Sequence, residues 1–139
     1  MRLMALDVGE KRIGIAISES GVLATPHSVL YRKSKQEDFA SFQELIDELK
    51  INRIIVGLPY SLSEPEKLGP QARRVKKYAE ALAQAVDIPF EYFDESYSTV
   101  DAESYLSLNQ RSGRKRKIPI DAAAAAVILQ NYLDAARRS

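Results

Sequence analysis

The stretch Leu3-Met-Ala-Leu-Asp-Val-Gly-Glu-Lys-Arg-Ile-Gly-Ile-Ala-Ile-Ser18 decides the fold of this chain. Its first half is almost wholly apolar, and side chains of a strand alternate between two faces, which predicts a buried first strand. A short turn at Gly9–Lys11 predicts that Arg12–Ser18 returns as an antiparallel second strand. One face of this second strand carries only small residues and admits another element at close range: Gly14, Ala16 and Ser18.

Asp7 is the residue that does not fit a purely structural strand. An ionised carboxylate among apolar neighbours costs several kcal/mol or more unless something offsets the cost. A basic side chain such as Lys11 or Arg12 would do so in a structural role, and a metal ion would do so in a functional one. Asp7 ends the first strand on the same face as Leu3 and Ala5.

The rest of the chain alternates between helical and strand patterns and predicts an α/β fold. The expected order is a third strand at 28–31, a helix at 36–50, a strand at 53–57, a loop at 60–70, a helix at 71–86, a strand at 89–93, a helix at 99–106 and a last helix at 120–137. The initial hairpin followed by strand–helix units predicts a mixed sheet, antiparallel at first and then parallel, flanked by helices. We expect a single domain over residues 1–139.

Composition narrows the function classes. The 139 residues are 45% hydrophobic and 28% charged, as in an ordinary globular protein, and their formal net charge is +1. The absence of cysteine excludes disulfides, thiolate zinc sites and cysteine nucleophiles. The apolar N-terminal run is too short for a signal peptide or a membrane span, so we expect a cytoplasmic protein with no membrane partner. No Walker-type loop, G-x-G-x-x-G or H-E-x-x-H motif occurs.

Three carboxylates share one kind of setting. Asp7 ends the first strand, Glu95 follows the strand at 89–93, and Asp121 lies in the first turn of the last helix. Sites in α/β sheets form at the carboxyl ends of strands, so Asp7 and Glu95 come close if their strands are neighbours. The face of the last helix that carries Asp121 continues through Ala124, Ala125, Ile128 and Tyr132 and must pack on the sheet. Oxygen ligands select hard cations, so three converging carboxylates predict a Mg²⁺ or Mn²⁺ site.

Basic residues gather near these acids. Five cations fall within residues 111–117, just before Asp121: Arg111, Arg114, Lys115, Arg116 and Lys117. A second cluster, Arg73-Arg-Val-Lys-Lys77, begins the helix at 71–86. Such basic runs often form solvated surface faces, but the run at 111–117 lies beside the proposed acid site, which indicates contacts with phosphates of a nucleic acid. No aromatic interleaving indicates base stacking, and the lone His27 is more typical of a plain surface or core residue than of a general base.

Four segments, in order along the chain, resemble motifs of the YqgF/RuvX family of RNase H-like nucleases. They are Asp7-Val-Gly-Glu-Lys-Arg-Ile-Gly-Ile-Ala-Ile-Ser18, Gly57-Leu-Pro59 with Gly69-Pro-Gln-Ala72, Asp94-Glu95 with Ser98-Thr99, and Asp121-x-x-Ala124-Ala125-x-x-Ile128-Leu129-Gln130-x-Tyr132-Leu133. The resemblance implies an RNase H-like fold and a metal-dependent endonuclease that matures the 5′ end of precursor 16S ribosomal RNA. It also implies that Asp7, Glu95 and Asp121 are the catalytic, metal-binding acids. For such a nuclease, the basic residues Lys11, Arg12 and those of 111–117 are our candidates to hold phosphates.

The family also carries the description of a Holliday junction resolvase, and the residues leave RNA and branched DNA open as substrates. The chain departs from the family at Ser96, where the motif has Arg, so a non-catalytic nucleic-acid-binding protein stays an alternative. An actin-like phosphotransferase, whose D-x-G hairpin also serves phosphates, would need a second domain that a chain of 139 residues does not hold.

Overall fold

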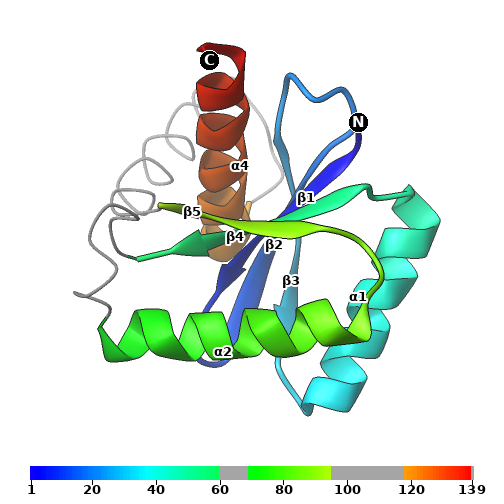
Figure 1. Cartoon of the computed structure of the whole chain (residues 1–139), viewed down its shortest axis with the longest axis vertical. Helices are drawn as coiled ribbons and strands as arrows, with labels where there is room; N and C mark the ends of the chain where they lie inside the picture. The colour runs from blue at the N-terminus through cyan, green and yellow to red at the C-terminus, as the bar shows by residue number, and fades with distance from the viewer. Residues whose placement is uncertain (60–68, 95–117, 139) are drawn as a thin grey trace.

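The structure, a computed structural model, describes residues 1–59, 69–94 and 118–138. Five strands form one sheet in the order β3-β2-β1-β4-β5 (Figure 1). They are β1 (Leu3–Val8), β2 (Arg12–Ser18), β3 (Thr25–Tyr31), β4 (Arg53–Leu58) and β5 (Phe90–Asp94). The helices are α1 (Lys35–Leu49), α2 (Pro70–Ala85) and α4 (Ile120–Arg138). The helix expected at 99–106 and most of the loop expected at 60–70 lie outside the described residues.

The predicted mixed five-stranded sheet is confirmed. Strands β1, β2 and β3 are antiparallel neighbours, whereas β4 is parallel to β1 and β5 is parallel to β4. The turn between β1 and β2 closes through the Gly9 N–H, which donates to the Arg12 carbonyl oxygen at 2.8 Å. Strand β3 begins three residues earlier than the sequence predicts, at Thr25. Pro26 is compatible with this because β3 is an edge strand, and a register shift at Ile15/Ala16 accommodates it.

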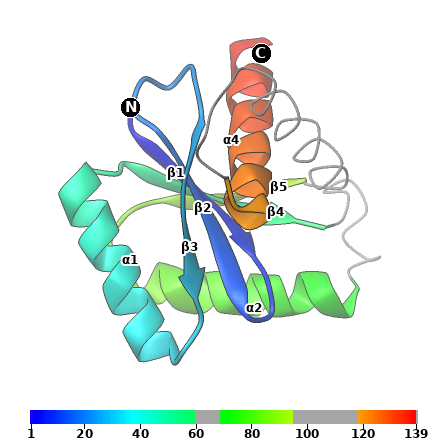
Figure 2. The same cartoon turned by 180° about the vertical axis from the view of Figure 1, so that it is seen from behind.

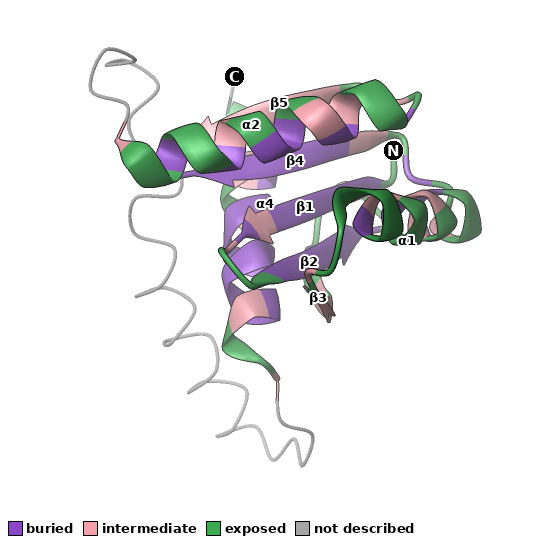
Figure 3. Ribbon diagram, turned by 90° about the horizontal axis from the view of Figure 1, so that it is seen from below, coloured by how far each residue is buried: buried purple, intermediate pink, exposed green. Residues whose placement is uncertain are grey.

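The two faces of the sheet have separate cores, as the alternation in β1 predicts. Met4, Leu6 and Val8 pack with α1 and α2, while Leu3 and Ala5 pack with α4. Figure 3 views the sheet from the side of α1 and α2, with α4 behind the strands, and Figure 2 shows the opposite side from Figure 1. Asp7 therefore belongs, by alternation, to the α4 face.

Helix α4 is more deeply buried than an amphipathic helix. Residues Ala122 to Leu129 are all buried, and the small side chains let the helix lie close to β1 and β2. The expected sheet-facing stripe is right for Ala125, Ile128 and Tyr132, which join the cluster on β1, β2 and β4. Ala124 instead groups with Ala123, Val127 and Ile118 in a separate cluster. No helix within the described ranges has the length and apolarity needed to cross a membrane.

A buried polar pair joins α1 to α2. The Tyr78 hydroxyl donates to Asp38 Oδ2 at 3.0 Å, and the Lys33 N–H donates to Asp38 Oδ1 at 3.0 Å. Asp38 is 3% exposed and Tyr78 is 2% exposed. Burial, together with this hydrogen bond to Asp38, raises the pKa of Tyr78 above its ordinary value of 10.0.

We expect Tyr78→Phe to lower the free energy of unfolding by about 1–3 kcal/mol, because the buried Asp38 carboxylate loses a donor. The unfolded chain releases the tyrosine proton near pH 10.0, whereas the folded chain retains it, so folding stability falls as pH rises above that value. The variant should show a shallower fall in the same range. Urea denaturation at neutral and alkaline pH measures both effects.

Tyr31→Phe is the matched control, because Tyr31 is 66% exposed. It should change stability by less than about 0.5 kcal/mol. Equal losses in the two variants would show that the Tyr78–Asp38 hydrogen bond contributes nothing.

Candidate active site

The site is built around a row of residues that crosses the sheet at the level of Asp7. Asp7 pairs with Gly14 of β2 on one side. On the other side, the register that pairs Leu6 with Val56 brings Asp7 level with Gly57, which itself pairs with Phe93 of β5. Two glycines thus flank Asp7, and neither places a side chain beside its carboxylate.

Gly14 is the point where the last helix meets the sheet. A Cβ on Gly14 would overlap the backbone carbonyl of Asp121 and would lie 3.1 Å from the Ala122 nitrogen. Only glycine allows the first turn of α4 to approach this closely. Because Gly14 is the direct partner of Asp7, and paired antiparallel residues have Cα atoms about 4.5–5.5 Å apart, the first turn of α4 is next to Asp7. The expected convergence of Asp7 and Asp121 is therefore supported by the backbone.

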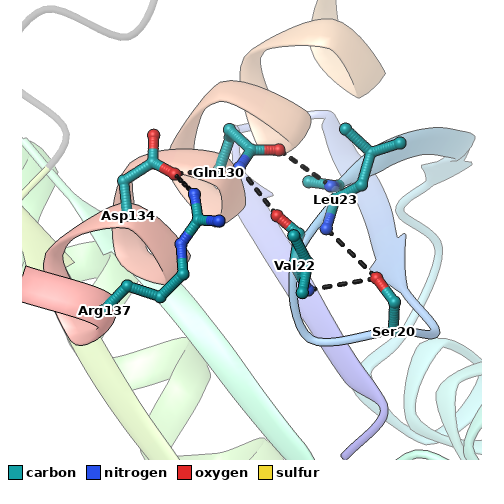
Figure 4. Close-up of polar contacts among 7 residues, drawn as sticks. Ser20, Val22, Leu23, Gln130, Asp134 and Arg137 are labelled. Carbon is teal, nitrogen blue, oxygen red and sulfur yellow. Dashed lines mark hydrogen bonds and ion pairs between the residues drawn. The ribbon is translucent and has the colours of Figure 1, made fainter.

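The far half of α4 is fixed by two sets of side-chain contacts. Gln130 accepts from the Ala24 N–H at 2.9 Å and donates to the Val22 carbonyl at 3.0 Å, in the segment between β2 and β3. Figure 4 shows Gln130 between that segment and Asp134, to which it also donates. On the other side of the helix Tyr132 packs edge-on against Phe93, with ring centroids 5.8 Å apart. These contacts orient the helix that carries Asp121.

Arg12 is the cation that contacts the site directly. Its Nε lies 3.5 Å from Asp121 Oδ2, with side chains 55% and 28% exposed respectively. An ion pair this exposed contributes at most about 1 kcal/mol to stability. The structural alternative paired Arg12 with Asp7, whereas the ion pair that the structure shows for Arg12 is with Asp121. The first strand is buried as predicted, and Asp7 is its one partly exposed residue.

Glu95 follows the last residue of β5 in the chain and lies outside the described residues, as do Arg111, Arg114, Lys115, Arg116 and Lys117. We expected Asp7 and Glu95 to come close if β1 and β5 were neighbours. The two strands are not neighbours, because β4 lies between them. Two strand spacings, about 10 Å, therefore separate β1 from β5. All three strands nevertheless run parallel and end at one edge, where Asp7 and Asp94 are found. Within residues 1–59, 69–94 and 118–138, no cluster of three acidic or histidine side chains is placed to hold a metal ion.

Lys11 and His27 are both exposed. Lys11 lies in the turn after Asp7, and its carbonyl accepts from the Arg32 N–H at 2.9 Å. The His27 ring Nδ1 lies 2.8 Å from the Ser28 hydroxyl on the edge strand β3, in keeping with the expected surface role.

Tyr31 is a candidate that the sequence did not single out. It is directly opposite Arg12 in the β2–β3 register and is 66% exposed. Its ring is thus an exposed apolar surface beside the Arg12–Asp121 pair. The sequence could have indicated Tyr31 by its position at the end of the third strand. There the alternation of side chains places it on the same face as Arg12.

Comparison with known proteins identifies the family of the chain. The RuvX family, described as "Holliday junction resolvase", matches residues 1–135. The chain belongs to the RuvX family. A Syntrophomonas wolfei protein named "Putative pre-16S rRNA nuclease" is 43% identical over 135 residues, which cover 96% of this chain and 94% of that protein. A Synechocystis protein of the same name is 39% identical over 135 residues, covering 96% and 88%.

Solved structures place this RuvX chain among RNase H-like folds. RuvC of T. thermophilus, in complex with a Holliday junction substrate, superposes with a TM-score of 0.64 at 16% identity, covering 99% of this chain and 96% of that one. The Fowlpox virus resolvase, in complex with Holliday junction DNA, superposes with a TM-score of 0.57 at 10% identity, covering 98% and 99%. The predicted RNase H-like fold is confirmed. Family membership makes the chain a nuclease, a hydrolase of phosphodiester bonds that acts on nucleic acid.

Proposed function

We propose that this RuvX-family chain is a metal-dependent endonuclease that processes the 5′ end of precursor 16S ribosomal RNA in the cytoplasm. The observation that carries the proposal is the seating of the first turn of α4 on Gly14, the direct partner of Asp7. That contact brings two acids from opposite ends of the chain to one edge of the sheet. The substrate follows the names of relatives about 40% identical to this chain.

Asp7, Glu95 and Asp121 are the proposed ligands of Mg²⁺ or Mn²⁺. The donor set fits, because carboxylate oxygens are the ligands that these hard cations take. Gly57, level with Asp7 on β4, places no side chain between β1 and β5 on the α4 face. Divalent ions held by these carboxylates would supply an activated water molecule and stabilisation of the leaving oxygen of a phosphodiester.

The protein's own residues supply binding and orientation. Lys11 and Arg12, on the turn and strand that follow Asp7, face solvent and are proposed to hold the phosphates on either side of the cleaved bond. Arg12 contacts Asp121 in this structure, and it is proposed to pair with substrate phosphate when Asp121 binds a cation. Arg111, Arg114, Lys115, Arg116 and Lys117 are proposed to extend the same basic surface.

A cleavage assay tests the substrate. We expect the protein to cut a precursor 16S ribosomal RNA fragment near its mature 5′ end with Mn²⁺ or Mg²⁺ present, and not with EDTA. An intact four-way DNA junction is assayed beside it, because the family description and the fold shared with RuvC favour junction resolution as the second candidate. Cleavage of the junction alone would replace the first function by the second, and cleavage of neither substrate with either metal would reject both.

A further inference from the structure

A hollow lies beside the β1–β2 turn, on the α1/α2 face of the sheet. It is a cavity of about 530 Å³. Its lining comes from the turn, from the end of β3 and start of α1, and from the first half of α2, and includes Gly9, Arg32, Lys35, Arg74, Lys77 and Tyr78. Figure 3 views the molecule from the side on which α1 and α2 lie. We refer to this cavity as the basic pocket.

Its charge is strongly one-sided. Among the lining residues that the structure describes, four are cations, namely Arg32, Lys35, Arg74 and Lys77, and one is a carboxylate, Glu10. In the parts of the chain that the structure describes, no ion pair joins any of these four cations to a carboxylate. Cations that converge on a cavity without acidic partners attract an anion, and phosphate is the anion that nucleic acid provides.

One of the four cations is held rigidly, unlike the side chains of a solvated surface. The Arg32 guanidinium donates to the Gly9 carbonyl at 2.8 Å and lies 4.3 Å from the centre of the Tyr78 ring. Tyr78 is fixed in turn by its buried hydrogen bond to Asp38. An arginine anchored this way loses less conformational freedom when it binds a phosphate, which favours a built anion site.

The pocket is continuous with the proposed active site through the turn. Gly9, which accepts from Arg32, is two residues after Asp7, while Arg12 leaves the same turn and reaches Asp121 on the α4 side. Cations thus follow the edge of the sheet on both sides of the turn. We propose that the basic pocket holds a phosphate group of the substrate strand beyond the cleaved bond. This inference rests on the proposed function and extends the contact surface to Arg32, Lys35, Arg74 and Lys77.

The test uses two double variants on α2 that remove the same charge. Arg74→Ala with Lys77→Ala empties one wall of the pocket, while Arg73→Ala with Lys76→Ala changes neighbouring residues that do not line it. Affinity for a fluorescent precursor rRNA fragment is measured by anisotropy over a salt series in EDTA, so that no cleavage occurs. We expect the pocket pair to weaken binding about tenfold or more and to reduce the salt slope by about 1.4, and the control pair to change both far less. Urea denaturation of both variants checks the fold.

Each outcome decides the question. A pocket pair that binds RNA no worse than the control pair would overturn the inference and leave the nuclease proposal intact. If calorimetry shows inorganic phosphate bound by the wild type and lost in the pocket pair, while RNA affinity is unchanged, the pocket serves a small phosphate-bearing molecule and the inference is also wrong. A pocket-specific loss of RNA binding, in a protein that does not cut precursor rRNA, would support the pocket and reject the proposed function.

Discussion

The variant Asp7→Asn should lose cleavage activity by about a thousandfold or more while it keeps the fold and binds RNA. Asparagine has nearly the shape of aspartate, so the β1 strand and its pairing with Gly14 are undisturbed. What is removed is the negative charge that would hold a divalent cation. Metal ions contribute several kcal/mol to the transition state of phosphoryl transfer, and about 4 kcal/mol corresponds to a thousandfold in rate.

Three measurements separate this expectation from simple misfolding. Initial rates on precursor rRNA with Mn²⁺ give the loss of activity, anisotropy in EDTA gives RNA affinity, and urea denaturation gives stability. Because Asp7 is only partly buried, stability should change by less than about 1 kcal/mol. RNA affinity in EDTA should be equal to or slightly higher than that of the wild type, because one negative charge near the phosphates has gone.

Asp87→Asn is the matched control. It makes the same chemical change at an exposed position between α2 and β5, at the opposite edge of the sheet from the proposed site. Its cleavage rate should equal that of the wild type. If Asp7→Asn also cleaves at the wild-type rate, Asp7 is not a catalytic ligand and the proposed metal site is wrong.

The parts of this architecture that could be predicted from sequence are those set by local pattern. The alternation in β1 and the small face of β2 were sufficient to assign Met4 and Ala5 to opposite cores and to bring α4 onto Gly14. The starts of α1 and α2 followed from apolar periodicity to within one residue, and the structure supplies the capping contacts that fix them. Ser34 accepts from the Glu37 N–H at 3.1 Å, and Pro70 opens α2 one residue before the predicted start.

Strand order across the sheet could not be predicted in the same way. Nothing in the strand at 89–93 states whether it pairs with β1 or with β4, since both are apolar and parallel pairing is compatible with either. The early start of β3 was missed because Thr25 and Pro26 read as loop residues, and their strand geometry depends on an edge position that only the assembled sheet supplies. The separation of Asp7 from the end of β5 depends on the strand order, so it could not be predicted from the sequence either.

The basic pocket could not be predicted from the sequence for a related reason. Arg74 and Lys77 belong to a cluster that the sequence shows, but Arg32 and Lys35 are isolated charges between two elements. They meet across about 40 residues of chain because α1 and α2 pack on the same face of the sheet, where the buried Asp38–Tyr78 pair joins them. The pattern of apolar residues along one element predicts which of its faces a residue occupies. A binding site also depends on how separate elements pack together, and that pattern does not predict their packing.

Gly14→Ala should have the largest effect on stability of any single methyl group added to this sheet. The added Cβ overlaps the carbonyl group of Asp121, which is backbone and has no rotamer to change. The first turn of α4 must therefore move away from β2, and the tightly packed alanines behind it must move too. Overpacking of this kind costs about 3 kcal/mol, which we expect as the loss in the free energy of unfolding in urea.

The same displacement should reduce cleavage, because Asp121 would be moved away from Asp7. Gly69→Ala is the control, since a Cβ there meets no atom of the described residues within 4 Å and its φ of −77° is open to any residue. That variant should lose less than about 1 kcal/mol, from weaker capping of α2, and should keep its activity. A Gly14→Ala protein that is as stable and as active as Gly69→Ala would mean that the contact between α4 and β2 is not close, and that the proximity of Asp7 and Asp121 inferred from it is wrong.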